Sequence, residues 1–167
     1  MTDTAETAVD NDSLETTNQN CVPMEHRIPT LREMALMLDE AGIDYIPLPE
    51  EDRLYVTALA LNIWIRVHPK SGGVLLYTNW DLDPVDDELG LLRHVNQLNI
   101  GFALVQFAWD EEHGRLHGHA WLSARGGLSR ATLVRTAIRF ADIFKEALEM
   151  TRSAGFALDE GDLATIN

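Results

Sequence analysis

Three histidines stand within seven positions in the stretch HGRLHGHAWL, residues 113–122. Imidazoles this close together could coordinate a metal ion or transfer protons. In a β-strand, side chains two residues apart share a face, so His117 and His119 would point the same way, together with Trp121. Zinc generally takes three or four protein ligands, whereas His113 falls in the turn before the strand. We therefore expect no metal here, because the spacing offers two ligands and no third.

The histidines belong to a predicted β-hairpin of residues 102–109 and 115–123, which turns through DEEHG. If Trp109 pairs with Arg115, one side of the hairpin carries aromatic, apolar and imidazole groups. The members of that side are Val105, Phe107, Trp109, His117, His119 and Trp121. The opposite side is small and apolar and suits close packing of helices. Its members are Phe102, Leu104, Ala108, Leu116, Gly118, Ala120 and Leu122.

The aromatic side of this hairpin has the composition of a protein interface. Aromatic rings with polar edges bury a large area and still form hydrogen bonds. We predict that it contacts a protein or peptide partner, or a second copy of the chain. The alternative is a second core layer beneath another helix. Trp64, Arg66 and His68 form a similar mixed face on a strand at residues 62–68.

Catalytic signatures are missing from the sequence. It contains no G-x-S-x-G nucleophile motif and no glycine-rich phosphate loop, and its serines stand in predicted turns, helix ends or the N-terminal arm. The paired carboxylates at residues 50–52 and 111–112 fall in predicted loops, where charged side chains are usually exposed to solvent and have no catalytic role. We expect a protein that is not an enzyme and needs no cofactor.

The composition restricts the partners further. The net charge of −14, from 27 acidic and 13 basic residues, repels phosphate backbones and anionic lipids, so we expect neither nucleic acid nor membrane as a partner. Cys21 is the only cysteine, which favours a reduced compartment. The N-terminal stretch lacks the features of a secretion signal, and no run reaches the about 18 apolar residues of a membrane helix. The expected location is the cytoplasm.

Helices and strands are predicted to alternate along the chain. Thr30 and Glu33 form a capping pattern that begins a helix reaching Gly42. Strands are predicted at 54–59, 62–68 and 74–79, with a short segment at 43–48 that is interrupted by prolines. Asp83 is the expected N-cap of a second helix, and Ser129 that of a long last helix. Residues 1–27 are predicted to be a disordered acidic arm, 28–156 the folded domain and 157–167 an acidic tail.

This order gives an α+β fold: helix, three-strand antiparallel meander, helix, β-hairpin and long C-terminal helix. Together with LREMALMLDEAGIDY, LLRHVNQLNIGFALVQFAWDEEHGRLHGHAWL and GGLSRATLVRTAIRFADIFKEAL, it resembles the YbjN-like family of bacterial proteins. That family is similar in fold to type III secretion chaperones of the CesT kind, which are dimers that bind extended client segments. The resemblance implies a non-enzymatic, chaperone-like or regulatory role without a cofactor.

The leading hypothesis is therefore a cytoplasmic α+β module that binds a protein client and forms a homodimer. A second hypothesis is a small metal-dependent or ligand-sensing protein that uses His117 and His119. A third is a purely structural subunit of a larger assembly.

Overall fold

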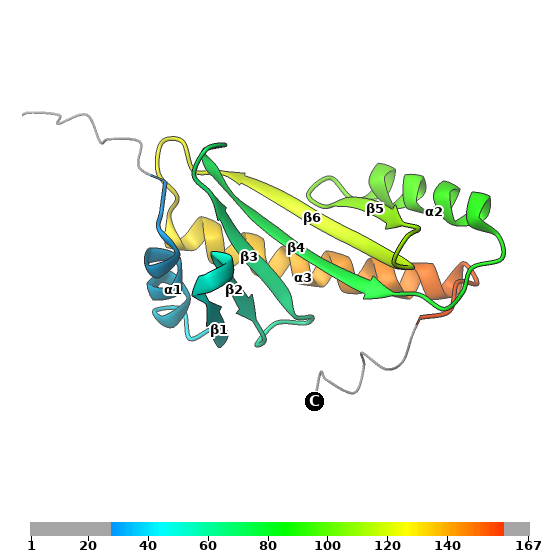
Figure 1. The fold of residues 1–167 in the computed structure, drawn as a ribbon, viewed down its shortest axis with the longest axis horizontal. Coiled ribbons are helices and arrows are strands. Elements are labelled where there is room, and N and C mark those ends of the chain that lie inside the picture. The colour runs from blue at the N-terminus through cyan, green and yellow to red at the C-terminus, as the bar shows by residue number, and fades with distance from the viewer. Residues whose placement is uncertain (1–27, 159–167) are drawn as a thin grey trace, which may run out of the picture.

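The structure is a computed structural model that describes residues 28–158. The predicted arm, with Cys21, and residues 159–167 of the predicted tail lie outside the described residues. One sheet and three α-helices make up the described chain (Figure 1). The elements in order are α1 (Leu31–Asp39), β1 (Tyr45–Leu48), the short 3-10 helix η1 (Pro49–Glu51), β2 (Arg53–Val56), β3 (Ile63–His68), β4 (Gly73–Asp81), α2 (Glu88–Gly101), β5 (Gln106–Asp110), β6 (Arg115–Ser123) and α3 (Arg130–Ser153).

The sheet has six strands in the order β1-β2-β3-β4-β6-β5, and every neighbouring pair is antiparallel. The predicted α+β class and order of elements are confirmed. The segment with prolines also joins the sheet, so the predicted three-strand meander has a fourth strand, β1. The longest pairing joins β4 to β6, from Gly73 opposite Ser123 to Asp81 opposite Arg115. These two strands form the middle of the molecule, and α3 lies behind them in Figure 1.

One side of the sheet is packed against the helices. Alternate strand residues enter this core, as expected for a sheet that buries one face. On the sheet they are Leu54, Val56, Ile63, Ile65, Val74, Leu76, Thr78, Trp80, Phe107, Leu116, Gly118 and Ala120. The apolar stripe of α3 covers them with Leu133, Ala137, Phe140, Ala141, Phe144, Ala147 and Leu148. The small residues predicted for helix packing on β6 do face the helices.

The helix ends follow local sequence signals. Thr30 and Glu33 form a complete capping box on α1, and the Ser129 side chain accepts a hydrogen bond from the backbone of Thr132 at the start of α3. The predicted cap of α2 at Asp83 is wrong, because the N-cap is Asp87, whose side chain accepts from the Gly90 N–H.

The chain remains extended near Asp83 because the end of the domain binds there. The Asp83 N–H donates to the carbonyl of Ala157, and Leu82 forms an isolated antiparallel bridge with Leu158. Leu158 is buried, so the folded part extends beyond the predicted boundary at residue 156. Among the described helices, none combines the length and apolar character that crossing a bilayer requires.

Candidate partner-binding face

The pairing of β5 with β6 differs by one residue from the prediction. Asp110 lies opposite Arg115, Trp109 opposite Leu116 and Phe107 opposite Gly118. The turn is therefore EEHG rather than DEEHG, and Gly114 has the left-handed φ of 67° expected for it. Because side chains alternate across a strand, this shift moves every β5 side chain to the other side of the sheet.

The predicted aromatic face is divided by this register. Val105 and Phe107 are buried at 1% and 5% exposure, and the Phe107 ring stacks on Phe144 of α3 at a centroid distance of 6.0 Å. Trp109 is partly buried against the same core. The grouping of these three residues with His117, His119 and Trp121 is therefore wrong. The core gains the two largest side chains of β5, and that burial favours the observed register.

The side of the sheet away from the helices forms one continuous surface, which we call the open face. Its side chains are all partly or fully exposed: Arg53, Tyr55, Trp64, Arg66, Leu75, Tyr77, Asn79, His117, His119 and Trp121. His117, His119 and Trp121 thus do lie on a common surface, and the mixed face predicted for Trp64 and Arg66 adjoins them through β4.

An aromatic row crosses four strands of the open face. Tyr55 pairs with Trp64, Trp64 with Tyr77 and Tyr77 with His119 in the strand register. The rings of Tyr55 and Trp64 are 4.8 Å apart, and those of Trp64 and Tyr77 are stacked at 5.7 Å. We use the name aromatic row for Tyr55, Trp64, Tyr77 and His119. Contact between neighbouring rings holds Tyr55, Trp64 and Tyr77 in place and so lowers the entropy that a partner must remove.

Arg53 fixes part of this row. Its guanidinium lies 5.8 Å from the Trp64 ring centroid, donates to the Tyr77 hydroxyl at 3.1 Å and forms an ion pair with Glu51. The hydrogen bond with Tyr77 is the main cause that raises the pKa of Arg53 above its ordinary value. Arg66, opposite Arg53, is exposed and forms no ion pair within the described part of the chain. The face therefore offers rings and at least one available cation.

Trp121 is the most exposed aromatic side chain of the open face, at 46%. Its ring lies over Gly73, where a β-carbon would stand 2.4 Å from the ring. The His68 ring packs beside it, with the centroids 5.8 Å apart. An indole that rests on a glycine keeps one ring surface available to a partner.

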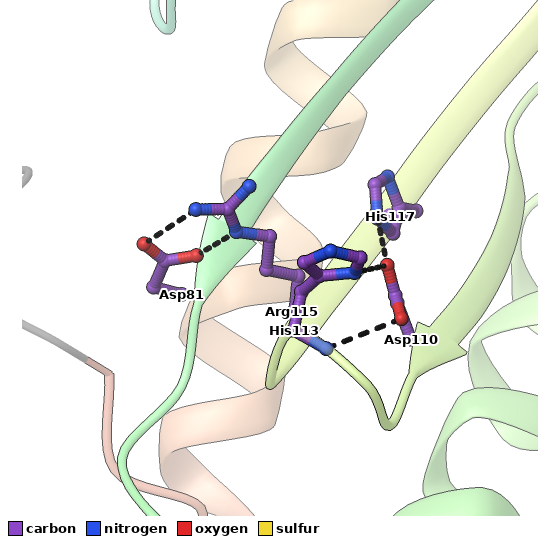
Figure 2. Close-up of polar contacts among 5 residues, drawn as sticks. All are labelled: Asp81, Asp110, His113, Arg115 and His117. Carbon is purple, nitrogen blue, oxygen red and sulfur yellow. Dashed lines mark hydrogen bonds and ion pairs between the residues drawn. The ribbon is translucent and has the colours of Figure 1, made fainter.

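A polar cluster ends the face at the β5–β6 turn (Figure 2). The Asp110 carboxylate accepts from His113 Nδ1 at 2.8 Å and from His117 Nε2 at 3.3 Å, while Arg115 pairs with Asp81. Partial desolvation raises the pKa of Asp110, but the hydrogen bonds from His113 and His117 outweigh it, so this pKa lies below its ordinary value. The cluster orients the turn and the rings near it.

Metal binding by the histidines finds no support in this geometry. His117 donates from Nε2 to Asp110, which fixes the proton on that nitrogen because a carboxylate only accepts. Within residues 28–158, no group of three or more His, Cys, Asp or Glu side chains is arranged to hold a metal ion.

The outer edge of β5 is partly closed by α2. The Asn99 side chain accepts from the backbone N–H of Phe107 at 2.8 Å and donates to its carbonyl at 3.0 Å. These are the groups that an added strand would need. The opposite edge strand, β1, contains Pro47, which has no N–H to donate. The open face is therefore a better platform for a partner than either edge.

Sequence reasoning missed Tyr55 and Tyr77, which join the two predicted parts of the face. Near Tyr55 the signal is the alternation of polar or aromatic residues with aliphatic ones in RLYV. The stretch VLLYTNW around Tyr77 gives no such signal, because Leu75 lies on the open face while Thr78 and Trp80 lie in the core. Strand order, which the sequence does not state, brings both tyrosines into one row.

No protein-family model matches this sequence, and no curated protein matches it. The fold is similar to that of YbjN from E. coli, described as a candidate transcription regulator. Its crystal structure aligns with a TM-score of 0.69 over 79% of this chain and 97% of YbjN. The two sequences are 14% identical, so the likeness concerns the fold alone. The predicted YbjN-like fold is confirmed.

Proposed function

We propose that this chain is a non-enzymatic protein-binding module that holds an extended segment of a partner protein across its open face. The observation that carries the proposal is the aromatic row together with Trp121, on the side of the sheet that the helices leave uncovered. Tyr and Trp are the residues most enriched at the energetic centres of interfaces.

The chemistry of the open face favours a peptide over other ligands. Stacked rings give apolar contact, while the Tyr and His edges and Arg66 give hydrogen bonds to a peptide backbone or an acidic side chain. A segment that lies across the strands would contact the row with several successive side chains. Selectivity of this kind is loose, which suits a chaperone-like or regulatory role.

The same surface could bind a second copy of the chain. A stable contact typically buries about 800 Å² on each partner. A homodimer through the open face would hide the aromatic row and compete with a client, so dimer and client complex are alternative states of one surface in this proposal. The likeness to CesT-type chaperones belongs here as well, as an expectation from the sequence resemblance.

The description of YbjN as a candidate regulator of transcription fits a role through protein contacts. Direct contact with DNA is disfavoured by the net charge of −14. The arginines of the open face do not offset that charge, because Arg53 pairs with Glu51 and Arg115 with Asp81.

The test is a peptide selection followed by affinity measurement. Peptides selected from a random library on the full chain are measured by fluorescence anisotropy against Trp121→Ala, Tyr77→Ala and the control Ile100→Ala. Ile100 is 71% exposed on α2, away from the open face. We expect the two open-face variants to weaken binding at least about tenfold, as for central interface residues, and the control to bind like the parent.

Circular dichroism and mass in solution complete the test. Folded open-face variants that bind the selected peptides as tightly as the parent would refute the proposal. A chain that is dimeric, and that becomes monomeric in Trp121→Ala, would assign the face to self-association instead.

A further inference from the structure

An apolar pocket lies on the helix side of the molecule, apart from the open face. Its volume is about 250 Å³. The apolar lining is Ala60, Leu61, Trp80, Leu148 and Leu158, and the charged rim is Lys145, Glu149 and Arg152. A dry cavity of about 150 Å³ is large enough to bind benzene, so this pocket has room for a large aliphatic side chain.

The chain itself leads to this pocket. Leu158, the last described residue, is part of its wall and is held there by the bridge with Leu82. The sequence continues as DEGDLATIN, in which Leu163 and Ile166 are the large apolar residues. Leu163 follows Leu158 by five residues, and an extended chain spans roughly 3.3–3.6 Å per residue. Both side chains are therefore within reach of the pocket.

The charges of the pocket and of this segment are complementary. Lys145 and Arg152 stand two turns apart on α3 at the rim and form no ion pair with another described residue. The segment brings three carboxylates, at residues 159, 160 and 162. Among the described residues that line the pocket, Glu149 alone is acidic, so the balance favours attraction.

We propose that residues 159–167 dock in this pocket, with Leu163 or Ile166 filling the apolar space and the carboxylates of the segment beside Lys145 and Arg152. Attachment through Leu158 makes the docking intramolecular, with an effective concentration in the mM range for a short linker. The docked segment covers apolar side chains of α3, the β2–β3 connection and β4. This proposal is independent of partner binding on the open face.

Disulfide trapping in the full chain tests the docking. In a Cys21→Ser background, Glu149→Cys is combined with Ala164→Cys, and the rate of internal disulfide formation under mild oxidation is followed by mass spectrometry. Two versions of this pair are compared. One carries Leu163→Asp and Ile166→Asp, and the matched control carries Thr165→Asp and Asn167→Asp, which adds the same charge and keeps the apolar side chains.

Docking predicts that the apolar-deleted version forms the disulfide about tenfold more slowly than its parent, because a buried aliphatic side chain contributes at least that factor. The matched control should remain within about twofold of the parent. Equal rates in all three chains would overturn the proposal, since a tethered segment without docking gives the same collision rate in each.

A second measurement uses the apolar anionic dye 1-anilinonaphthalene-8-sulfonate on chains without introduced cysteines. We expect the dye to bind Leu163→Asp/Ile166→Asp about tenfold more tightly than the unaltered chain, because the dye and the segment compete for one pocket. Equally tight binding to both chains would mean that the pocket is open to a free ligand and would also overturn the proposal.

Discussion

Phe144 lies so close above Gly118 that a β-carbon on the glycine would meet the ring Cδ2 at 2.4 Å. The contact joins the middle of α3 to the middle of β6, and Phe144 is fully buried, so the ring has no space into which it can retreat. The distance between the long helix and the sheet therefore depends on the absence of a side chain at residue 118.

Gly118→Ala should lower the free energy of unfolding by about 1–3 kcal/mol, the usual cost of overpacking a core. Urea denaturation measures it. The matched control is Gly101→Ala at the end of α2, where a β-carbon would meet nothing within 4 Å. That variant should be as stable as the parent or more stable by up to about 1 kcal/mol. A loss of the same size at both positions would contradict the steric explanation.

Asn99→Ala should destabilise the chain by about 1–3 kcal/mol and increase aggregation, because it removes both hydrogen bonds to Phe107 and exposes the edge of β5. Light scattering at rising concentration, together with thermal unfolding, tests both effects. Asn96→Ala, an exposed position one turn earlier in α2, serves as the control and should behave like the parent. Normal solubility and stability of Asn99→Ala would mean that other contacts close the edge.

His94 should make stability sensitive to mild acid. Burial lowers the pKa of His94 below its ordinary value of 6.5, and its Nε2 lies 2.9 Å from the Thr151 hydroxyl. Between the lowered pKa and 6.5 the unfolded chain binds more protons than the folded chain, so stability decreases as the pH falls through this window. His94→Gln should flatten the dependence measured by urea denaturation between about pH 7 and pH 5.

The control for this experiment is Arg93→Gln, which removes an exposed charge from the same helix. It should keep the pH dependence of the parent. A His94→Gln variant with the parental slope would assign the acid sensitivity to other groups.

Asp110 should stabilise the turn at neutral pH but not in strong acid. Its pKa is lowered by the hydrogen bonds from His113 and His117, so its contribution is present above the ordinary value of 3.8 and is lost as the pH falls through the lowered value. Asp110→Asn should therefore lower the melting temperature at pH 7, and the difference from the parent should shrink near pH 2–3. Glu111→Gln, in the same turn, should leave the melting temperature unchanged both at pH 7 and in acid. A difference that stays constant with pH would refute the assignment.

Local signals predicted the helices well. Thr30 with Glu33, and Ser129 before a long apolar stripe, determine where α1 and α3 begin, because each signal acts within a few residues. The cap of α2 was mispredicted because Asp83 is engaged by Ala157, which is distant in sequence. Helix ends are thus predictable where no remote segment competes for the same backbone groups.

The candidate site was only partly predictable. Side-chain alternation identified His117, His119 and Trp121 correctly as one face, but it did not determine which β5 residues oppose them. That register depends on Phe107 and Trp109 entering the core beside Phe144, a packing preference between distant segments. The contribution of Tyr55 and Tyr77 depends on strand order and was likewise beyond local pattern.

The hydrogen bonds of Asn99 to Phe107 also limit how copies of the molecule can associate. Fibre growth by lateral strand pairing requires that both borders of the sheet in each subunit can form backbone hydrogen bonds, one with the preceding copy and one with the next. With one border occupied by an amide from its own helix, such a chain of subunits cannot continue beyond a pair.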